Sequence, residues 1–296
     1  MNRHTKDLSK QATKMKSKLI FIALIPLIVI LEGCGLSNSK GQLTGVEGRK
    51  PWYHPQPYGT IYVPTGTFHM GNTSEDITYS LTTRPKQVSI QAFFMDDTEI
   101  TNNEYRQFVY WVRDSMAKKM IGGEHLVEGE GGERINWDVR IRYDEPEVQD
   151  MISEMQYQGA DRIEGETGFD TRKYEYNYKW IDLHEAAKSK YISDPVARSE
   201  FIREEKTRIY PDTLVWIRDF TYSYNDPMTQ YYFFHPGYDD YPVVGVNWHQ
   251  ARAFSFWRTY YLNEYYQSVG EPNINPFRLP TVAEWEYAAR GGRDFS

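Results

Sequence analysis

The sequence predicts an α+β fold with short strands, few helices and little regular structure. Short extended runs are separated by turns, three helix starts carry capping boxes, and Gly and Pro together make up 36 of the 296 residues. The chain is 40% hydrophobic and 25% charged, a composition typical of a globular protein that can bury a core.

The first folded part begins with strand signals and ends in a helix. Residues 61–63 and 67–71 flank a Pro-Thr-Gly turn, which predicts a β-hairpin, and residues 88–95 form a second extended run. Thr101 followed by Glu104 is a capping box that starts a helix. The spacing of four apolar residues in that helix predicts one buried face: Tyr105, Phe108, Val109 and Val112.

A similar order of elements returns near the end of the chain. Residues 242–246 predict a short buried strand, and Asn247 with Gln250 starts a helix with a core-facing stripe of Ala251, Phe254, Trp257, Tyr261 and Tyr265. Thr281 with Glu284 caps a third helix, ended by Gly291 and Gly292. In it we expect Trp285, Ala288 and Ala289 to face one way and Glu286 to pair with Arg290.

Residues 114–240 have a pattern of their own. From Lys173 to Trp180 aromatic and polar residues alternate strictly, which predicts a strand with one aromatic face, more often a core face than an interface. Residues 214–217, followed by Phe220, Tyr222 and Tyr224, predict further strands. Residues 195–205 predict an exposed charged helix, and residues 122–132 an acidic loop.

The N-terminus predicts a lipoprotein signal. Residues 1–18 carry six basic side chains, and residues 19–31 are an uncharged apolar run, at about 20 Å too short for a lasting membrane span. Gly33-Cys34 then resembles a lipobox, so we predict a signal peptide over residues 1–33, a lipid anchor on Cys34 and a flexible tether over residues 34–57. Ordinary signal cleavage beside a chance cysteine is the alternative, and Met15 is an alternative start.

Composition excludes several kinds of site. The net charge of −7 argues against a nucleic-acid partner, because binding to phosphate backbones needs a clustered positive field. Cys34 is the single cysteine, which excludes an intrachain disulfide and any cysteine-based metal cluster. The seven histidines show no metal-binding spacing. A carboxylate pair of Asp239 or Asp240 with Glu284 is disfavoured because Glu284 already caps a helix. We therefore assign no catalytic, cofactor or metal residue.

Two segments resemble the formylglycine-generating enzyme, or sulfatase-modifying factor, family. They are residues 63–71 with 94–108, and residues 242–257 with the run Arg278-Leu-Pro-Thr-Val-Ala-Glu-Trp-Glu-Tyr-Ala-Ala-Arg-Gly-Gly292. The resemblance implies an irregular, C-type-lectin-like fold. In that family the catalytic cysteines lie in the later part of the module, beyond residue 296, so we expect a module truncated at its C-terminal half. Residues 58–113 and 241–296 are its first and middle parts, and residues 114–240 are a large insertion.

Within this family, the chain resembles gliding-motility lipoproteins of the GldK/PorK type, which belong to the type IX secretion machinery. The features that carry this resemblance are the insertion, the lipobox and residues 100–115. That resemblance implies a structural protein without enzyme activity or cofactor. It would be anchored in the outer membrane on the periplasmic face, and would form a ring with itself and a GldN/PorN-type periplasmic subunit. Two alternatives stay open: an envelope-anchored oxidase of the formylglycine type with its catalytic half beyond residue 296, and a glycan-binding module.

Overall fold

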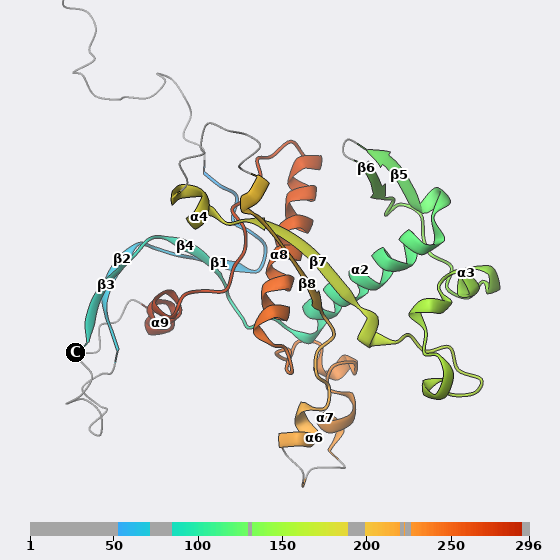
Figure 1. The fold of residues 1–296 in the computed structure, drawn as a ribbon. Helices are drawn as coiled ribbons and strands as arrows, with labels where there is room; N and C mark the ends of the chain where they lie inside the picture. Colours follow the sequence, from blue (N-terminus) through green and yellow to red (C-terminus); the bar gives the residue numbers. More distant parts are fainter. Residues whose placement is uncertain are drawn as a thin grey trace, which may run out of the picture. The chain divides into compact units, whose positions relative to one another are not determined.

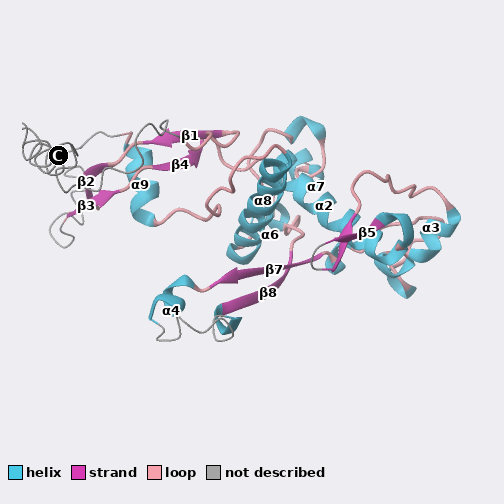
Figure 2. Ribbon diagram, turned by 90° about the horizontal axis from the view of Figure 1, so that it is seen from above, coloured by secondary structure: helices cyan, strands magenta, loops and turns pink. Residues whose placement is uncertain are grey.

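The computed structural model describes residues 53–71, 85–129, 132–188, 199–219, 222 and 226–291 (Figure 1). Within these residues the protein combines helices with short strand pairs and long irregular connections, which confirms the predicted α+β class (Figure 2). Each sheet of the described part has two strands. None of the described helices has the length and apolar character needed to cross a membrane.

Two long helices form the centre of the described fold, and both begin as predicted. They are α2 (Asn102–Ile121) and α8 (Trp248–Ser268). At the start of α2 the Thr101 hydroxyl accepts from the Glu104 amide, and the Glu104 carboxylate accepts from the Thr101 amide at 2.8 Å. At the start of α8, Asn247 and Gln250 make the same reciprocal pair at 3.0 and 2.8 Å. These caps satisfy backbone groups that a helix end leaves unpaired.

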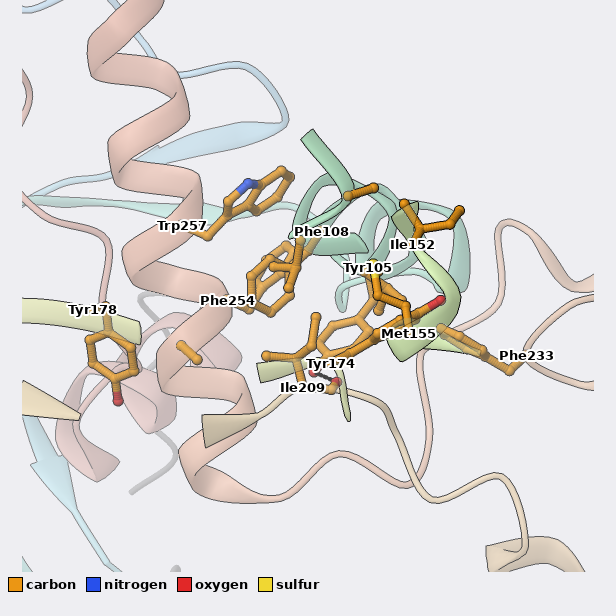
Figure 3. Packing of buried hydrophobic residues seen from close by; sticks show 14 of the residues in the cluster. Tyr105, Phe108, Ile152, Met155, Tyr174, Tyr178, Ile209, Phe233, Phe254 and Trp257 are labelled. Carbon is orange, nitrogen blue, oxygen red and sulfur yellow. Dashed lines mark hydrogen bonds between the residues drawn. The ribbon is translucent and has the colours of Figure 1, made fainter. Parts of the chain in front are cut away.

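Aromatic rings join α2 to α8. Tyr105 stacks on Phe254 with ring centroids 5.6 Å apart, and Phe108 lies 5.2 Å from Trp257. All four side chains are buried, as the apolar spacing predicted (Figure 3). Burying rings of this size stabilises the fold by about 2–3 kcal/mol each. The contact between the two helices is therefore the main core of the described residues.

The predicted stripe on α8 is correct for its first half only. Tyr261 and Tyr265 are 56% and 59% exposed, whereas Ala253 and Tyr266 are buried. Trp111 of α2 contacts this helix at Trp257 and Tyr260, whereas the ring of Tyr261 stacks on Trp257 of its own helix. Near its end the helix is contacted on another face, where His54 packs on Tyr266.

The predicted hairpin between the first two strands is wrong. β1 (Thr60–Val63) pairs with β4 (Phe93–Asp96), and β2 (Gly66–Met70) pairs with β3 (Lys86–Ile90), all antiparallel. Both pairs keep one register, so they form a single two-stranded ribbon interrupted at residues 64–65 and 91–92. The chain does not reverse at Pro64-Thr65, because the strands on both sides of this step keep the same register. The Thr65 hydroxyl bridges the break by donating to the carbonyl of Ile90 in the partner strand at 2.8 Å.

The third capped helix, α9 (Val282–Arg290), covers this ribbon. Tyr287 is buried against Phe68 at 5.4 Å, and Arg290 donates to the carbonyl of Gly71 at 2.7 Å while also pairing with Glu286 as predicted. The predicted inner face is wrong for Trp285, which is 60% exposed. It is also wrong for Ala289, which is exposed, and correct for Ala288, which packs on the ribbon with Ala283 and Tyr287. Glu286 and Arg290 meet the backbone of Gly71 from the same helix.

Residues 114–240 contain one correctly predicted strand. β7 (Glu175–Ile181) is present, and its aromatic residues pack into the core. Its partner is β8 (Ile202–Arg208), so the predicted exposed helix is wrong where described, and residues 195–198 of it lie outside the described residues. The sequence of β8 is polar on both faces, so it lacks the alternation that identifies a half-buried strand.

Three further local predictions are wrong. The predicted strand at residues 214–217 is the short helix α6 (Val215–Asp219), and the acidic loop contains a hairpin of β5 (Leu126–Gly129) and β6 (Gly132–Ile135). Residues 242–246 make only an isolated bridge, from Pro242 to Thr101. Other short helices are α3 (Pro146–Met151), α4 (Leu183–Lys188) and α7 (Pro227–Tyr231). Short apolar runs do not distinguish strands from helices or irregular segments.

Gly245 is required where the insertion returns to α8. Its φ is +81°, its carbonyl accepts from the Asp212 amide at 2.8 Å, and a Cβ there would lie 2.2 Å from the Asp212 carbonyl oxygen. Gly270 has a similar φ of +76°, but a Cβ at that position would have nothing within 4 Å. Comparing substitutions at the two glycines therefore distinguishes the effect of backbone strain, present at both, from that of a steric clash, present only at Gly245.

We predict that Gly245→Ala lowers the free energy of unfolding by at least about 2 kcal/mol, because the methyl adds a clash with backbone to the strain of a positive φ. Gly270→Ala, the control, should cost about 1 kcal/mol from strain alone. Denaturant unfolding measures both. Equal losses would show that Gly245 is not packed against Asp212.

Candidate functional site

The predicted lipid anchor lies outside the described residues. Cys34 and the tether up to residue 52 are among the residues whose structure is not described, so lipidation of Cys34 stays a prediction. The candidate site is therefore the described part of residues 114–240, which the sequence predicts to be an insertion and which is called the insertion below, together with the helices that hold it.

Aromatic side chains of β7 fix the insertion to α8. The ring of Tyr178 stacks on Phe256 at 4.7 Å, and Trp180 lies 5.9 Å from the same ring. The guanidinium of Arg252 lies over Trp180, 4.0 Å from the ring centroid. At the other end of the strand, Tyr176 meets Phe108 of α2 edge-on at 5.3 Å. The insertion thus contributes aromatic side chains to the main core, as the aromatic alternation predicted.

A polar cluster secures the second strand of the insertion. Glu205 of β8 contacts Nδ1 of His249 at 2.7 Å and the guanidinium of Arg252 at 3.4 Å. Burial raises the pKa of Glu205, but the hydrogen bond with His249 and the charge of Arg252 outweigh it, so this pKa lies below its ordinary value. The sequence predicted His249 only as a first-turn polar residue, because its partner lies 44 residues away.

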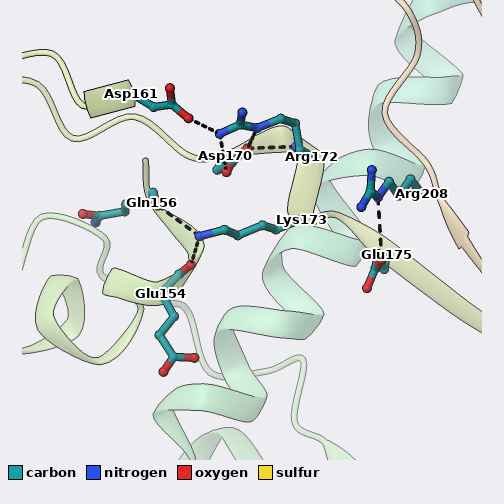
Figure 4. Close-up of polar contacts among 8 residues, drawn as sticks. All are labelled: Glu154, Gln156, Asp161, Asp170, Arg172, Lys173, Glu175 and Arg208. Atoms are coloured by element: carbon teal, nitrogen blue, oxygen red, sulfur yellow. Dashed lines mark hydrogen bonds and ion pairs between the residues drawn. The ribbon is translucent and has the colours of Figure 1, made fainter. Parts of the chain in front are cut away.

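A groove of about 630 Å³ opens between α2 and the insertion. Its residues come from the last turns of α2, from residues 153–158, from residues 172–175 at the start of β7 and from Arg208, the partner of Glu175 at the same end of the β7–β8 pair. Met116 and Met120 contribute thioether side chains, and the charged groups are Glu154, Arg172, Lys173, Glu175 and Arg208 (Figure 4). No sequence pattern indicated this groove, because its residues come from four separate segments.

The cations of the groove are largely engaged within the protein. Arg172 donates to Asp170 at 2.7 Å and to Asp161 at 2.7 Å, and its hydrogen bonds lower the pKa of Asp170 (Figure 4). Lys173 donates to the carbonyls of Glu154 and Gln156 at 2.6 and 3.4 Å. The groove therefore offers charged and thioether groups for non-covalent contact, with most of its charge already paired.

In the run of residues 278–292, Glu284 has a structural role. Arg278 binds Glu284 with two hydrogen bonds of 2.6 and 2.8 Å, and Glu284 also caps α9. The hydrogen bond from Arg278 lowers the pKa of Glu284 to about 2. Asp239 pairs instead with Arg106, so the structure does not bring the disfavoured carboxylate pair together. The described residues include no cluster of three or more histidines and carboxylates arranged to hold a metal ion.

The model of the sulfatase-modifying factor enzyme 1-like domain matches residues 50–296. The chain belongs to this family. A formylglycine-generating enzyme of Bos taurus is 23% identical over 246 residues, covering 83% of this chain and 43% of the relative. The serine/threonine-protein kinase pkn1 of Chlamydia pneumoniae is 30% identical over 162 residues, covering 52% of this chain and 22% of the relative.

The match to these relatives is partial in length. Pkn1 of Chlamydia trachomatis is 40% identical over 58 residues, which is 20% of this chain and 7% of the relative. The chain spans less than half the length of the curated relatives it matches. The family match, by contrast, includes both the helical core and the α9 segment of this chain.

We predict that Glu284→Gln lowers stability by about 1 kcal/mol at pH 7, since the cap remains but the partly exposed pair with Arg278 is lost. A pKa lowered from 4.5 to about 2 stabilises the fold above pH 4.5, and this contribution disappears as pH falls toward 2. Unfolding curves of the two proteins should converge over that interval. Glu271→Gln, on the loop after α8, is the control; a gap that persists at pH 2 would contradict the ion pair.

We predict that Phe256→Ala destabilises the protein by about 2–3 kcal/mol, because it removes the ring on which Tyr178 and Trp180 pack. Tyr261→Ala, on an exposed position of the same helix, should cost less than about 1 kcal/mol. Thermal unfolding gives both values. If limited proteolysis cuts the insertion no faster in Phe256→Ala than in Tyr261→Ala, the insertion is not held by α8.

Proposed function

We propose that this protein is a structural subunit of the type IX secretion and gliding-motility machinery, with the sulfatase-modifying-factor-like domain serving as a scaffold. In this role it is an outer-membrane lipoprotein, anchored through Cys34 and facing the periplasm. It assembles with itself and with a GldN/PorN-type periplasmic subunit into a ring. The N-terminal leader pattern, the lipobox-like Gly33-Cys34 and the likeness of residues 100–115 to the GldK/PorK type support this proposal.

The observation that carries the proposal is the way the insertion is built into the core. Its strand β7 packs on α8 through Tyr178 and on α2 through Tyr176, and Tyr105 of α2 donates to the carbonyl of Ile209 just after β8 at 2.7 Å. A segment fixed by contacts to both long helices presents a constant surface at low conformational cost, which favours assembly with other subunits.

The surface of the insertion also has the residue types of an interface. Ile163, Leu214, Tyr222 and Tyr231 are each more than half exposed, and charged groups surround the groove beside α2. Interfaces commonly combine such aromatic and aliphatic residues with a polar rim. These features support a role in assembly and do not require chemistry at the site.

We expect full-length protein, extracted from its own membranes with mild detergent, to bring a stoichiometric periplasmic subunit and to elute as an assembly far larger than 34.9 kDa. Cys34→Ala should lose the membrane fraction, since acyl chains supply the attachment, whereas Ser37→Ala in the same tether should keep it. Mass spectrometry and fractionation measure both effects.

Two outcomes would contradict the proposal. Wild-type protein that always elutes alone would exclude the assembly, and Cys34→Ala that stays in the membrane would exclude the anchor. The same purified samples test the alternative, because an oxidase of the formylglycine type would produce formylglycine in a mass-spectrometric assay.

A further inference from the structure

The strand β7 has a free hydrogen-bonding edge. Backbone bonds from Ile209 to Tyr174 (3.0 Å) and from Asp182 to Phe201 (2.8 Å) fix which residue pairs of the β7–β8 ladder are bonded. Because bonded pairs alternate along an antiparallel ladder, the even-numbered residues of β7 bond to β8. The odd-numbered residues direct their N–H and C=O groups away from β8: Glu175, Asn177, Lys179 and Ile181.

The two outer edges of the pair differ. On β8, the side-chain amide of Gln250 closes the outer edge at one end by donating to the carbonyls of Arg208 and Tyr210 at 3.1 and 2.8 Å. On β7, no described residue bonds to the outward backbone groups. An unpaired edge of this length is a template for another strand.

Helix α8 continues beneath the position of a third strand. Glu205 of β8 contacts Arg252, and its neighbour Tyr178 of β7 contacts Phe256. One step across the sheet, about 4.8 Å, thus advances about one turn along the helix, which rises about 5.4 Å per turn. The next step reaches Tyr260, whose side chain is exposed.

The side chains at that position form an aromatic shelf, made of Trp111, Trp137 and Tyr260. Trp111 stacks on Trp137 at 5.3 Å and meets Tyr260 at 6.0 Å. Trp137 and Tyr260 are 39% and 46% exposed, and the buried Nε1 of Trp111 has no hydrogen-bond acceptor among the described residues. Trp111 also meets Tyr176 of β7 edge-on at 6.0 Å, so the free strand edge and the aromatic floor lie beside each other.

We propose that an extended segment of a partner protein adds to β7 as a third strand, over the shelf of Trp111, Trp137 and Tyr260. The proposal rests on the assembly role above and names the surface used. The segment has aromatic or aliphatic residues at alternate positions toward the shelf. Its opposite face is polar, because it lies beside Glu175, Asn177 and Lys179, whose side chains bond to residues of β8.

A second copy of this chain does not fit the same place through its own β7. Antiparallel pairing of two β7 edges about a two-fold axis puts both aromatic faces on one side of the joined sheet. Each β7 already has its own α8 packed on that face, at Phe256. Since α8 also extends beneath the third-strand position, the two helices would occupy the same space. The occupant is therefore a strand with no helix on its inner face.

Proline substitutions on the two outer edges test this surface. Asn177→Pro removes an outward N–H from β7, and Lys206→Pro removes one from β8, so neither breaks the ladder between them. Each also loses one surface contact, to Glu204 and Glu175 respectively, and Asn177→Ala controls for the first. Thermal unfolding of the full-length variants checks that all three remain folded.

We expect the amount of co-purified partner to fall at least about ten-fold with Asn177→Pro and to stay unchanged with Lys206→Pro and Asn177→Ala. In the wild-type assembly, hydrogen exchange of the amides of Asn177 and Lys179 should be at least about ten-fold slower than in the purified chain, while those of Glu204 and Lys206 should be unchanged.

The outcomes separate this inference from the proposed function. An assembly that forms normally with Asn177→Pro, or with unprotected β7 amides, overturns the third strand and leaves the scaffold role standing. Wild-type protein that elutes alone with unprotected amides overturns both. Protection that rises with the concentration of the purified chain alone identifies a second copy as the occupant and overturns the partner strand.

Discussion

The packing of α2 against α8 through aromatic rings is the constraint on which the other contacts depend. Tyr105 is 1% exposed and Phe108 is fully buried, and both touch Phe254 of α8. The Tyr105 hydroxyl is also tied to the carbonyl of Ile209, where β8 ends. A side chain of α2 therefore serves as a fixed point for the insertion, since moving it would leave a buried hydroxyl unpaired.

From this centre the structure extends in two directions. On one side β7 and β8 are held on α8 by aromatic stacking and by the cluster of Glu205, His249 and Arg252. On the other, Arg258 of α8 binds Asp96 of the β1–β4 pair at 2.7 Å, and α9 covers the adjoining β2–β3 pair through Tyr287. Residues 114–240 are thus packed into the same core as the segments on either side of them, and the family model covers all of these residues. This shared packing is the physical basis of the proposed role.

Features encoded by near neighbours could be predicted from the sequence. The three capping boxes, the buried face of α2, the aromatic strand β7 and the Glu286–Arg290 pair each depend on residues within a few positions, and the structure has all of them. Contacts between distant segments could not be predicted. The ribbon pairing of β1 with β4, the Glu205–His249 contact and the exposure of Tyr261 depend on which elements meet, and the polar strand β8 shows no alternation. The anchor at Cys34 stays a prediction.

Native-state hydrogen exchange tests most directly whether the insertion and the family core are one cooperative unit. We expect the inward amides of Tyr176, Tyr178 and Trp180 in β7 to exchange with the same opening free energy as the central amides of α8, and with the same dependence on denaturant. That result would show that the insertion opens only when the core opens. Amides of β7 that exchange through a separate, lower-energy opening while α8 stays protected would contradict the account.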